Sequence, residues 1–276
     1  MSDGLEIHVA RRVATVWLAR EKVRNAFNET LIAELTAAFT RLGADDGVRA
    51  IVLAGRGPAF CAGADLDWMR RFAGYSDAEN RADGRALAEM LRTIYLCPKP
   101  TIARVHGDAY AGGMGLVATC DIAVAAANVN FCLTETRLGL IPATISPYIV
   151  RALGEQAARR YALTAERFDA AEALRLGFVH AVAAPEALDA QVETILAALL
   201  QTSAHAVAQA KRLVRDVAGR PIDEALLDDT AGRIAAIRAS ADGREGVRAF
   251  LDKRKPRWVV QYEAEIAAAE GDDEEM

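Results

Sequence analysis

The stretch from residue 106 to residue 121, HGDAYAGGMGLVATCD, has the residue types of an anion site made from main-chain groups. Small residues precede an apolar run, and a helix beginning near Gly112 would open among them. Small side chains let a ligand approach the backbone closely. The first amides of a helix have no partner within it and lie at the positive end of its dipole. The stretch therefore predicts a site that could hold a developing oxyanion.

Other side chains with possible chemistry have more ordinary interpretations. Cys61 has no histidine near it in sequence, so we expect a buried structural thiol rather than a nucleophile. His106 stands at the end of a predicted strand and is expected to be a hydrogen-bonded structural residue. Asp65 and Asp67 lie at a predicted helix start, where capping is the default role of a carboxylate. No cluster of metal-ligating residues supports them, so no metal is predicted.

The glycines of the opening stretch have an alternative explanation. Gly112, Gly113 and Gly115 do not form the dinucleotide-binding pattern G-x-G-x-x-G. Tight packing of a helix against a sheet would also require them. The pattern alone does not decide between packing and ligand binding.

The elements that must position this stretch are those of an α/β protein. Apolar or alternating runs predict strands, and runs with helical spacing predict helices. Asn28 is a candidate cap of the first helix, Gly43 its end, and Ser76 to Glu79 a capping box for the second. The predicted strands are 5–9, 13–18, 50–54, 101–105, 122–126 and 178–182, and the predicted helices between them are 28–42 and 76–96. Alternating strands and helices are typical of βαβ units and a layered α/β domain.

The rest of the chain has a helical pattern. A small helical pair is predicted over 154–176, with Gly177 as its cap. Four helices are then predicted at 186–200, 203–218, 221–240 and 243–254. The charge-rich end after Trp258 is predicted to be solvated or frayed.

Composition excludes several classes of function. The chain has 276 residues, 52% of them hydrophobic, which predicts a soluble, helix-rich globular protein. Its formal charge of −5 argues against a nucleic-acid partner. The acidic N-terminus is unlike a signal peptide and no run is long enough to span a membrane, so we expect a cytoplasmic protein without a membrane partner. The four separated cysteines are expected to be reduced.

Five stretches taken together resemble the crotonase (enoyl-CoA hydratase/isomerase) superfamily over residues 5–260. They are Arg24-Asn25-Ala26, AFCAGADL at 59–66, Gly112-Gly113, Cys120-Asp121-Ile122 and FCLTETRLGLIP at 131–142. The resemblance implies a layered ββα superhelix. It also implies an acyl-CoA-binding catalytic core over 1–200 and a helical trimerisation region over 201–276.

The resemblance also assigns catalytic roles. The amides of Ala64 and Gly112 match the two donors of the family's oxyanion hole, and Glu135 matches a catalytic glutamate of the hydratases. The family's other glutamate has no counterpart, because Gly115 stands at its position. The alternative for Glu135 is a surface carboxylate that pairs with Arg137 or caps a turn.

The resemblance predicts that coenzyme A is part of the substrate and that there is no separate cofactor. Expected contacts with the acyl-CoA are Lys22, Arg24, Ala62, Asp65, Leu66 and Gly113. The stretches GGMGL, FCLTETRLGLIPATISPY and YALTAERFDA look most like hydratases of 3-methylglutaconyl-CoA and isohexenylglutaconyl-CoA, whose acyl groups are branched and carboxylated. Arg137 or Arg151 could meet a substrate carboxylate.

The predicted activity is therefore that of an enoyl-CoA hydratase, a lyase, acting through Glu135. One alternative is a double-bond isomerase that uses Glu135 as its single acid and base. Another is a non-catalytic acyl-CoA or RNA-binding protein with the same fold. A homotrimer or a dimer of trimers is expected from the resemblance.

Overall fold

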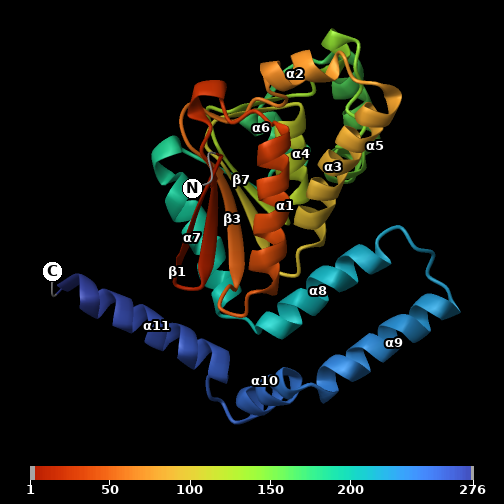
Figure 1. Cartoon of the computed structure of the whole chain (residues 1–276). Coiled ribbons are helices and arrows are strands. Elements are labelled where there is room, and N and C mark those ends of the chain that lie inside the picture. Colours follow the sequence, from red (N-terminus) through yellow and green to blue (C-terminus); the bar gives the residue numbers. More distant parts are fainter. Residues whose placement is uncertain (1–3, 275–276) are drawn as a thin grey trace. The chain divides into compact units, whose positions relative to one another are not determined.

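A computed structural model of the chain describes residues 4–274 (Figure 1). The chain divides into two compact units, Met1–Thr194 and Ile195–Met276. The division lies within helix α7 (Leu188–Leu200), whose last residue is the predicted boundary of the catalytic core. Each unit is described by itself.

The first unit is built on a six-stranded sheet with the strand order β1-β2-β3-β5-β7-β10. β1 pairs antiparallel with β2, and every other neighbouring pair is parallel. All six residues of β3 are buried, as its continuous apolar run predicts for a strand covered on both faces. The strands are Leu5–Ala10, Val13–Leu18, Ala50–Gly55, Thr101–Val105, Ile122–Ala126 and Ala181–Ala183.

The last of these strands begins later than predicted. We expected residues 178–182, but the amides of Phe178 and Val179 both donate to the carbonyl of Ala173 at the end of α6 (Ala170–Arg175). These bonds hold both residues in the helix end, so that β10 begins only at Ala181.

Helices α1 (Glu29–Ala44) and α3 (Asp77–Leu96) lie side by side along the sheet (Figure 1). Their predicted caps are confirmed: Asn28 accepts the amide of Leu31, and Ser76 and Glu79 form the capping box. The predicted end of α1 at Gly43 is wrong. Gly43 stays helical, and a Cβ there would lie 3.1 Å from Pro98, so this glycine makes room for close packing.

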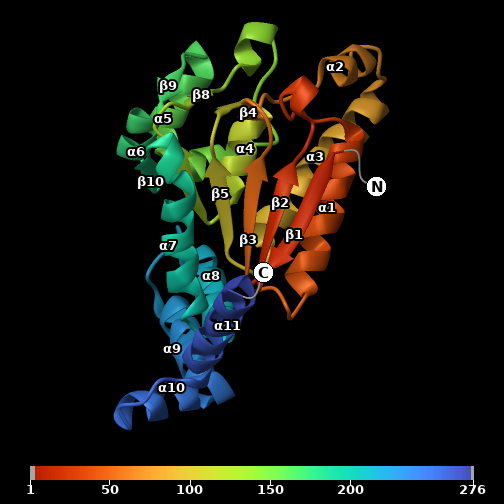
Figure 2. The ribbon, with the colours of Figure 1, turned by 90° about the vertical axis from the view of Figure 1, so that its left-hand side faces the viewer.

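A second, four-stranded sheet was not predicted. It contains β4 (Ala59–Cys61), β6 (Asp108–Tyr110), β8 (Asn130–Cys132) and β9 (Phe168–Asp169), in that order. Helix α4 (Gly112–Thr119) contacts strands of both sheets. Figure 2 shows β4, β8 and α4 together beyond the ends of β3 and β5. The start of α4 is thereby placed where several chain segments meet.

The predicted helical pair over 154–176 begins earlier in the structure. Helix α5 (Ser146–Thr164) is interrupted at Gly154, where φ is 74°, and α6 follows it. Gly177, with φ of 76°, has the left-handed conformation of a helix cap. Stacked rings of Phe131, Phe168 and Tyr161 join β8, β9 and α5 in the core.

The second unit is helical, as predicted. After the end of α7 it comprises α8 (Ala204–Val217), α9 (Glu224–Ala239), α10 (Ala241–Leu251) and α11 (Arg257–Glu274). The end after Trp258 was predicted to be solvated or frayed; it is helical as far as Glu274 instead of frayed, and its residues 259–267 are exposed or half-buried, as expected of a solvated segment. The ring of Trp258 lies 3.2 Å from a Cβ built on Gly246, a contact that anchors the start of α11. Residues 275 and 276 of the predicted tail lie outside the described residues.

Candidate active site

Two loops run side by side at the predicted oxyanion site. The amide of Ala62 donates to the carbonyl of Arg24 at 3.0 Å, and the amide of Phe27 donates to the carbonyl of Gly63 at 2.7 Å. The amide of Asp65 then donates to the carbonyl of Phe27 at 2.8 Å. This ladder makes a parallel bridge between Phe27 and Ala64. Ala64 is thereby held between two residues that are both bound to Phe27.

The start of α4 lies against the same loop. A Cβ built on Gly63, whose φ is 94°, would lie 2.9 Å from the Cβ of Ala111 and 3.7 Å from the amide nitrogen of Gly112. Ala64 follows Gly63 directly, so the loop that carries Ala64 lies against the start of α4. Within residues 4–274, neither the amide of Ala64 nor that of Gly112 has a protein acceptor.

The first glycines of α4 permit this approach. A Cβ on Gly112 would lie 2.5 Å from the ring of Phe27, and one on Gly113 would lie 2.3 Å from the carbonyl oxygen of Cys61. Ala111 before them has φ of 48° and ψ of −121°, a conformation that non-glycine residues rarely adopt. The packing explanation of these glycines is therefore correct, and the packing also leaves the amide of Gly112 free of protein partners.

Glu135 begins a short 3-10 helix, η2 (Glu135–Leu138). The carbonyl of Cys132, three residues earlier, accepts the amide of Ala111 at 2.8 Å, so this segment is tied to the residue before Gly112. Glu135 is half-buried, and its Oε2 is buried without a hydrogen-bond partner in the described chain. Burial raises the pKa of Glu135, against the opposing effect of its own main-chain amide.

The alternative explanation of Glu135 as one half of a surface pair with Arg137 does not fit this geometry. The guanidinium of Arg137 donates to the carbonyl of Ala165 instead. Arg151 likewise donates to a main-chain carbonyl, that of Pro147, at 2.7 Å. In the part of the chain that the structure describes, neither arginine has an acidic partner.

Gly115 is buried one turn into α4, and the space beside it is filled. A Cβ there would lie 2.3 Å from Cγ2 of Ile145 and 3.6 Å from Cδ2 of Leu91. Ile145 is 2% exposed and Leu91 is fully buried. The residues present therefore exclude a carboxylate side chain at position 115.

The residues predicted to contact coenzyme A fall into two groups. Lys22 and Arg24 are exposed at η1 (Glu21–Val23), and neither has an acidic partner within residues 4–274. Leu66 is 68% exposed at the start of α2 (Leu66–Phe72), and Ala62 beside the loop is half-buried. Gly113 is buried under β4, so only its main chain could take part.

Asp65 is used within the protein. Its Oδ1 accepts the amides of Asp67 and Trp68 at the start of α2, and its Oδ2 forms an ion pair with Arg20 at 2.9 Å. Burial raises the pKa of Asp65, but these amides and the guanidinium together hold it below its usual value. The capping role is confirmed, and the carboxylate is occupied where a contact with substrate was expected.

Sequence reasoning missed the part played by Asn25. This side chain is fully buried; its Oδ1 accepts the amide of Arg20 at 2.9 Å, and its Nδ2 donates to the carbonyls of Arg56 and Ala59. It therefore holds the loop that carries Phe27 to β4. The only signal for this role in the sequence is the residue type. Asn25 has φ of 57°, and asparagine tolerates this conformation better than most residues.

The structural interpretations of Cys61 and His106 are confirmed. Burial raises the pKa of the Cys61 thiol to about 12, which leaves almost no thiolate at neutral pH. The Nε2 of His106 lies 2.9 Å from the carbonyl of Gly57, its Nδ1 is buried without a partner in the described chain, and burial lowers the pKa of its ring. Over residues 4–274 there is no group of side chains that could hold a metal ion and no helix that could cross a membrane.

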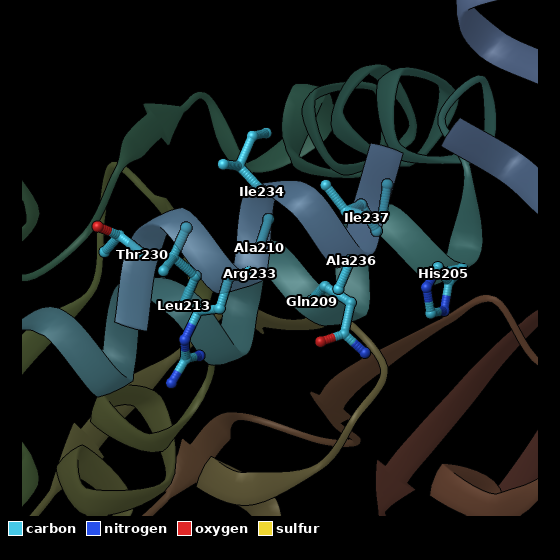
Figure 3. A pocket seen from close by; sticks show the side chains of 10 residues that line it. His205, Gln209, Ala210, Leu213, Thr230, Arg233, Ile234, Ala236 and Ile237 are labelled. Carbon is cyan, nitrogen blue, oxygen red and sulfur yellow. The ribbon is translucent and has the colours of Figure 1, made fainter. Parts of the chain in front are cut away.

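The second unit contains a pocket of about 400 Å³ between α8 and α9 (Figure 3). Leu213, Ile234 and Ile237 give it apolar walls, and Arg233 lies at one end. None of the residues predicted for the active site lines it.

Comparison with known proteins decides the family. The sequence model of the enoyl-CoA hydratase/isomerase family matches residues 9–261. The chain belongs to this family. Among family members, a crotonyl-CoA hydratase from Syntrophomonas wolfei is 32% identical over 93% of this chain and 98% of its own length. An enoyl-CoA hydratase from Alternaria alternata is 36% identical over 90% of this chain and 81% of its own.

The solved structures agree with the fold. That of an enoyl-CoA hydratase from Shewanella pealeana is 41% identical, with a TM-score of 0.91, and the match covers 94% of this chain and 97% of that one. The predicted superfamily, its layered α/β fold and the enzyme class, a lyase of the hydratase type, are confirmed.

Proposed function

We propose that this enzyme adds water across the double bond of an enoyl-CoA, with the amides of Ala64 and Gly112 as its oxyanion hole and Glu135 as its acid and base. The observation that carries the proposal is the buried, unpartnered oxygen of Glu135 on a segment tied to the start of α4. A buried polar atom without a partner is costly to fold. Glu34 and His106 also have one in the described chain, but Glu135 combines it with a raised pKa and with a segment tied to the start of α4, which is the combination expected of a reacting group. This favours an enzyme over a non-catalytic binding protein.

The reaction follows from these groups. Two amides without protein acceptors can bind the thioester oxygen, which makes the β-carbon electrophilic and stabilises the enolate. The Glu135 carboxylate takes a proton from water as the oxygen adds to the β-carbon. The resulting carboxylic acid then returns a proton to the α-carbon, a role that suits a carboxyl group whose pKa is raised by burial.

For the coenzyme A part of the substrate, we assign the phosphates to Lys22 and Arg24. Both are exposed cations without an acidic partner in the described chain, and the carbonyl of Arg24 is bound to Ala62. The exposed side chain of Leu66 and the neighbouring, half-buried Ala62 would then contact the same coenzyme A group. Asp65 and Gly113 would contribute by holding this part of the chain in place: the carboxylate of Asp65 is bonded within the protein, and Gly113 packs against Cys61.

An absorbance assay tests the activity. The enzyme is given crotonyl-CoA, 3-methylglutaconyl-CoA and a 3-enoyl-CoA; loss of the conjugated thioester reports hydration of a 2-enoyl-CoA, and its appearance from the 3-enoyl-CoA reports isomerisation. We expect water addition to at least one 2-enoyl-CoA. Conversion of the 3-enoyl-CoA alone, without hydration of any 2-enoyl-CoA, would contradict the proposal.

Double-bond isomerisation is the second candidate, and one observation favours it. Ile145 closes the space beside Gly115, so Glu135 is the single carboxylate assigned to the reaction. An isomerase moves one proton between two carbons, for which a single carboxylate is sufficient. The same assay separates the two reactions.

We further propose a branched or carboxylated acyl group, with Arg137 as its cation. Arg137 lies in η2 with Glu135. Burial raises the pKa of Cys132, and the nearby charge of Arg137 opposes this rise. We expect Arg137→Gln to lower kcat/KM for 3-methylglutaconyl-CoA by about tenfold while leaving crotonyl-CoA nearly unchanged, since one charge-assisted bond is lost. Arg159→Gln is the control, because Arg159 is an exposed arginine that pairs with Glu155 and has no assigned contact with the substrate. Equal loss for both substrates would argue against a carboxylate contact.

Assembly as a trimer or a dimer of trimers remains part of this proposal. It is supported by exposed apolar side chains on the second unit, among them Val214 at 68%, Phe250 at 83% and Leu251 at 70%. Surfaces of this kind commonly mark protein interfaces.

A further inference from the structure

The side chain of Arg20 joins the two loops that carry the Phe27–Ala64 bridge. Its guanidinium donates one hydrogen bond to the carbonyl of Ala26 and another to Oδ2 of Asp65, at 2.9 Å. Ala26 precedes Phe27, and Asp65 follows Ala64. One side chain therefore links the residues that flank the bridge on each side.

The main chain of Arg20 is also fixed. Its amide donates to Oδ1 of the buried Asn25, and its carbonyl accepts the amides of Val23 and Asn25 at 3.1 and 2.9 Å. These bonds stabilise the turn between β2 and Phe27 through contacts within the turn. The guanidinium therefore extends from a rigid base.

The ion pair is sheltered from solvent. The side chain of Arg20 is 18% exposed and that of Asp65 is 8% exposed. Removing one partner of such a pair leaves a poorly solvated charge, unlike the loss of a surface pair. The remaining oxygen of Asp65 holds the start of α2, so the residue after Ala64 is held from both sides.

We propose that Arg20 is a positioning residue of this enzyme, which sets the direction of the Ala64 N–H by holding Ala26 and Asp65 at a fixed separation. The inference rests on the proposed function, because it gives that amide a role in catalysis. Arg20 acts through Ala64, and its planar fork serves two acceptors at once. A lysine ammonium keeps the charge without this fork.

The test uses the full-length enzyme with Arg20→Gln and Arg20→Lys, and Arg104→Gln as the matched control. Arg104 is similarly sheltered, at 15% exposure, and pairs with Asp189. Three quantities are measured: kcat and KM for hydration, the midpoint of thermal unfolding, and the near-ultraviolet absorbance of bound acetoacetyl-CoA. This ligand gains an enolate band when main-chain donors stabilise its oxyanion.

We expect Arg20→Gln to lower kcat about tenfold or more and to weaken the enolate band, with a change of less than about threefold in KM, because a displaced donor costs rate more than binding. Arg20→Lys should lie between it and the wild type. Arg104→Gln should lose stability but keep kcat and the band.

A Gln variant that is destabilised like the control and retains wild-type kcat and band would overturn the inference. If that variant does not fold, wild-type kcat and band in Arg20→Lys would overturn it. A wild-type enzyme that neither hydrates a substrate nor shows the band would reject the proposed function and this inference with it. An active wild type with an unaffected Arg20→Gln rejects the positioning role alone.

Discussion

The carboxyl group of Glu135 carries a conflict between stability and chemistry. Burial disfavours its charged form, but a general base must be charged to accept a proton. The protein holds it in η2, where Oε2 is buried and unpartnered in the described chain. A neutral side chain of the same shape should therefore stabilise the fold and remove the activity.

For Glu135→Gln we expect hydration to fall about 100-fold or more, since a general base is lost. We expect the free energy of unfolding at neutral pH to rise by about 1 kcal/mol, because a poorly solvated charge is removed. The raised pKa fixes the pH dependence. Wild-type glutamate is protonated in both states at pH values below the ordinary range of the residue, and it destabilises the folded state as pH rises through its raised pKa.

The difference in unfolding free energy between Glu135→Gln and wild type should therefore be small in acid and grow toward neutral pH. Urea titrations at several pH values measure it. Glu155→Gln is the control, because Glu155 is 75% exposed and pairs only with Arg159 on the same helix face. A Gln variant that is less stable at neutral pH, or that retains turnover, would refute the role of Glu135.

At the scale of the element, the packing of α4 depends on three glycines, because a Cβ at any of these positions would meet a neighbouring residue. Its first amide faces the loop of Ala64, its second residue lies under β4, and Gly115 meets Ile145. The loop before α5 is itself bonded internally, with the amide of Ser146 on the carbonyl of Pro142 at 2.9 Å. Ile145 therefore has little freedom to move aside.

We expect Gly115→Ala to destabilise the protein by about 1 to 3 kcal/mol through overpacking, because the new methyl group would lie 2.3 Å from Ile145. Ile145→Ala in the same chain removes the Cγ2 methyl group that the new Cβ would meet, and it should recover part of this loss. Gly84→Ala, on α3 with nothing within 4 Å, should instead raise stability by about 0.5 to 1 kcal/mol. Thermal unfolding is measured for Gly115→Ala, for Ile145→Ala alone, for the double variant and for Gly84→Ala, and additive changes at 115 and 145 would exclude the contact.

Most elements of five residues or more could be predicted from the sequence, α11 being an exception, and most shorter ones could not, β10 being an exception. The periodicity and caps of α1 and α3 were sufficient, as was the apolar run of β3. β4, β6, β8 and β9 have two or three residues each, too few to show alternation. The 3-10 helix that begins at Glu135 is equally short, so its burial could not be predicted.

The candidate site could be assigned from the sequence only where family motifs cover it. The opening stretch alone indicated an anion site at Gly112, but Ala64 and Glu135 were assigned only by resemblance. The link that Arg20 makes between Ala26 and Asp65 was not predicted, because Asp65 lies 45 residues away in sequence. The hydrogen bonds and ion pair of the Asp65 carboxylate could not be predicted for the same reason, since no local pattern shows which partners its oxygens have.

At the scale of the whole molecule, the second unit leaves its apolar side chains exposed. Phe250 and Leu251 end α10, and Val214 lies on α8. The predicted trimer would cover such a surface. We expect Phe250→Glu to reduce the mass measured by light scattering, because a buried charge in an interface is costly. Arg244→Ser, an exposed change on the same helix, should leave the mass unchanged. A monomeric wild type would contradict the predicted assembly.

The burial of Cys61 has a practical consequence for handling the enzyme. Its carbonyl oxygen lies against Gly113 and its thiol pKa is about 12, so peroxide and maleimide reagents, which attack thiolates, should pass over it. Fluorescent labelling elsewhere on the protein should therefore leave Cys61, at the end of β4, unmodified.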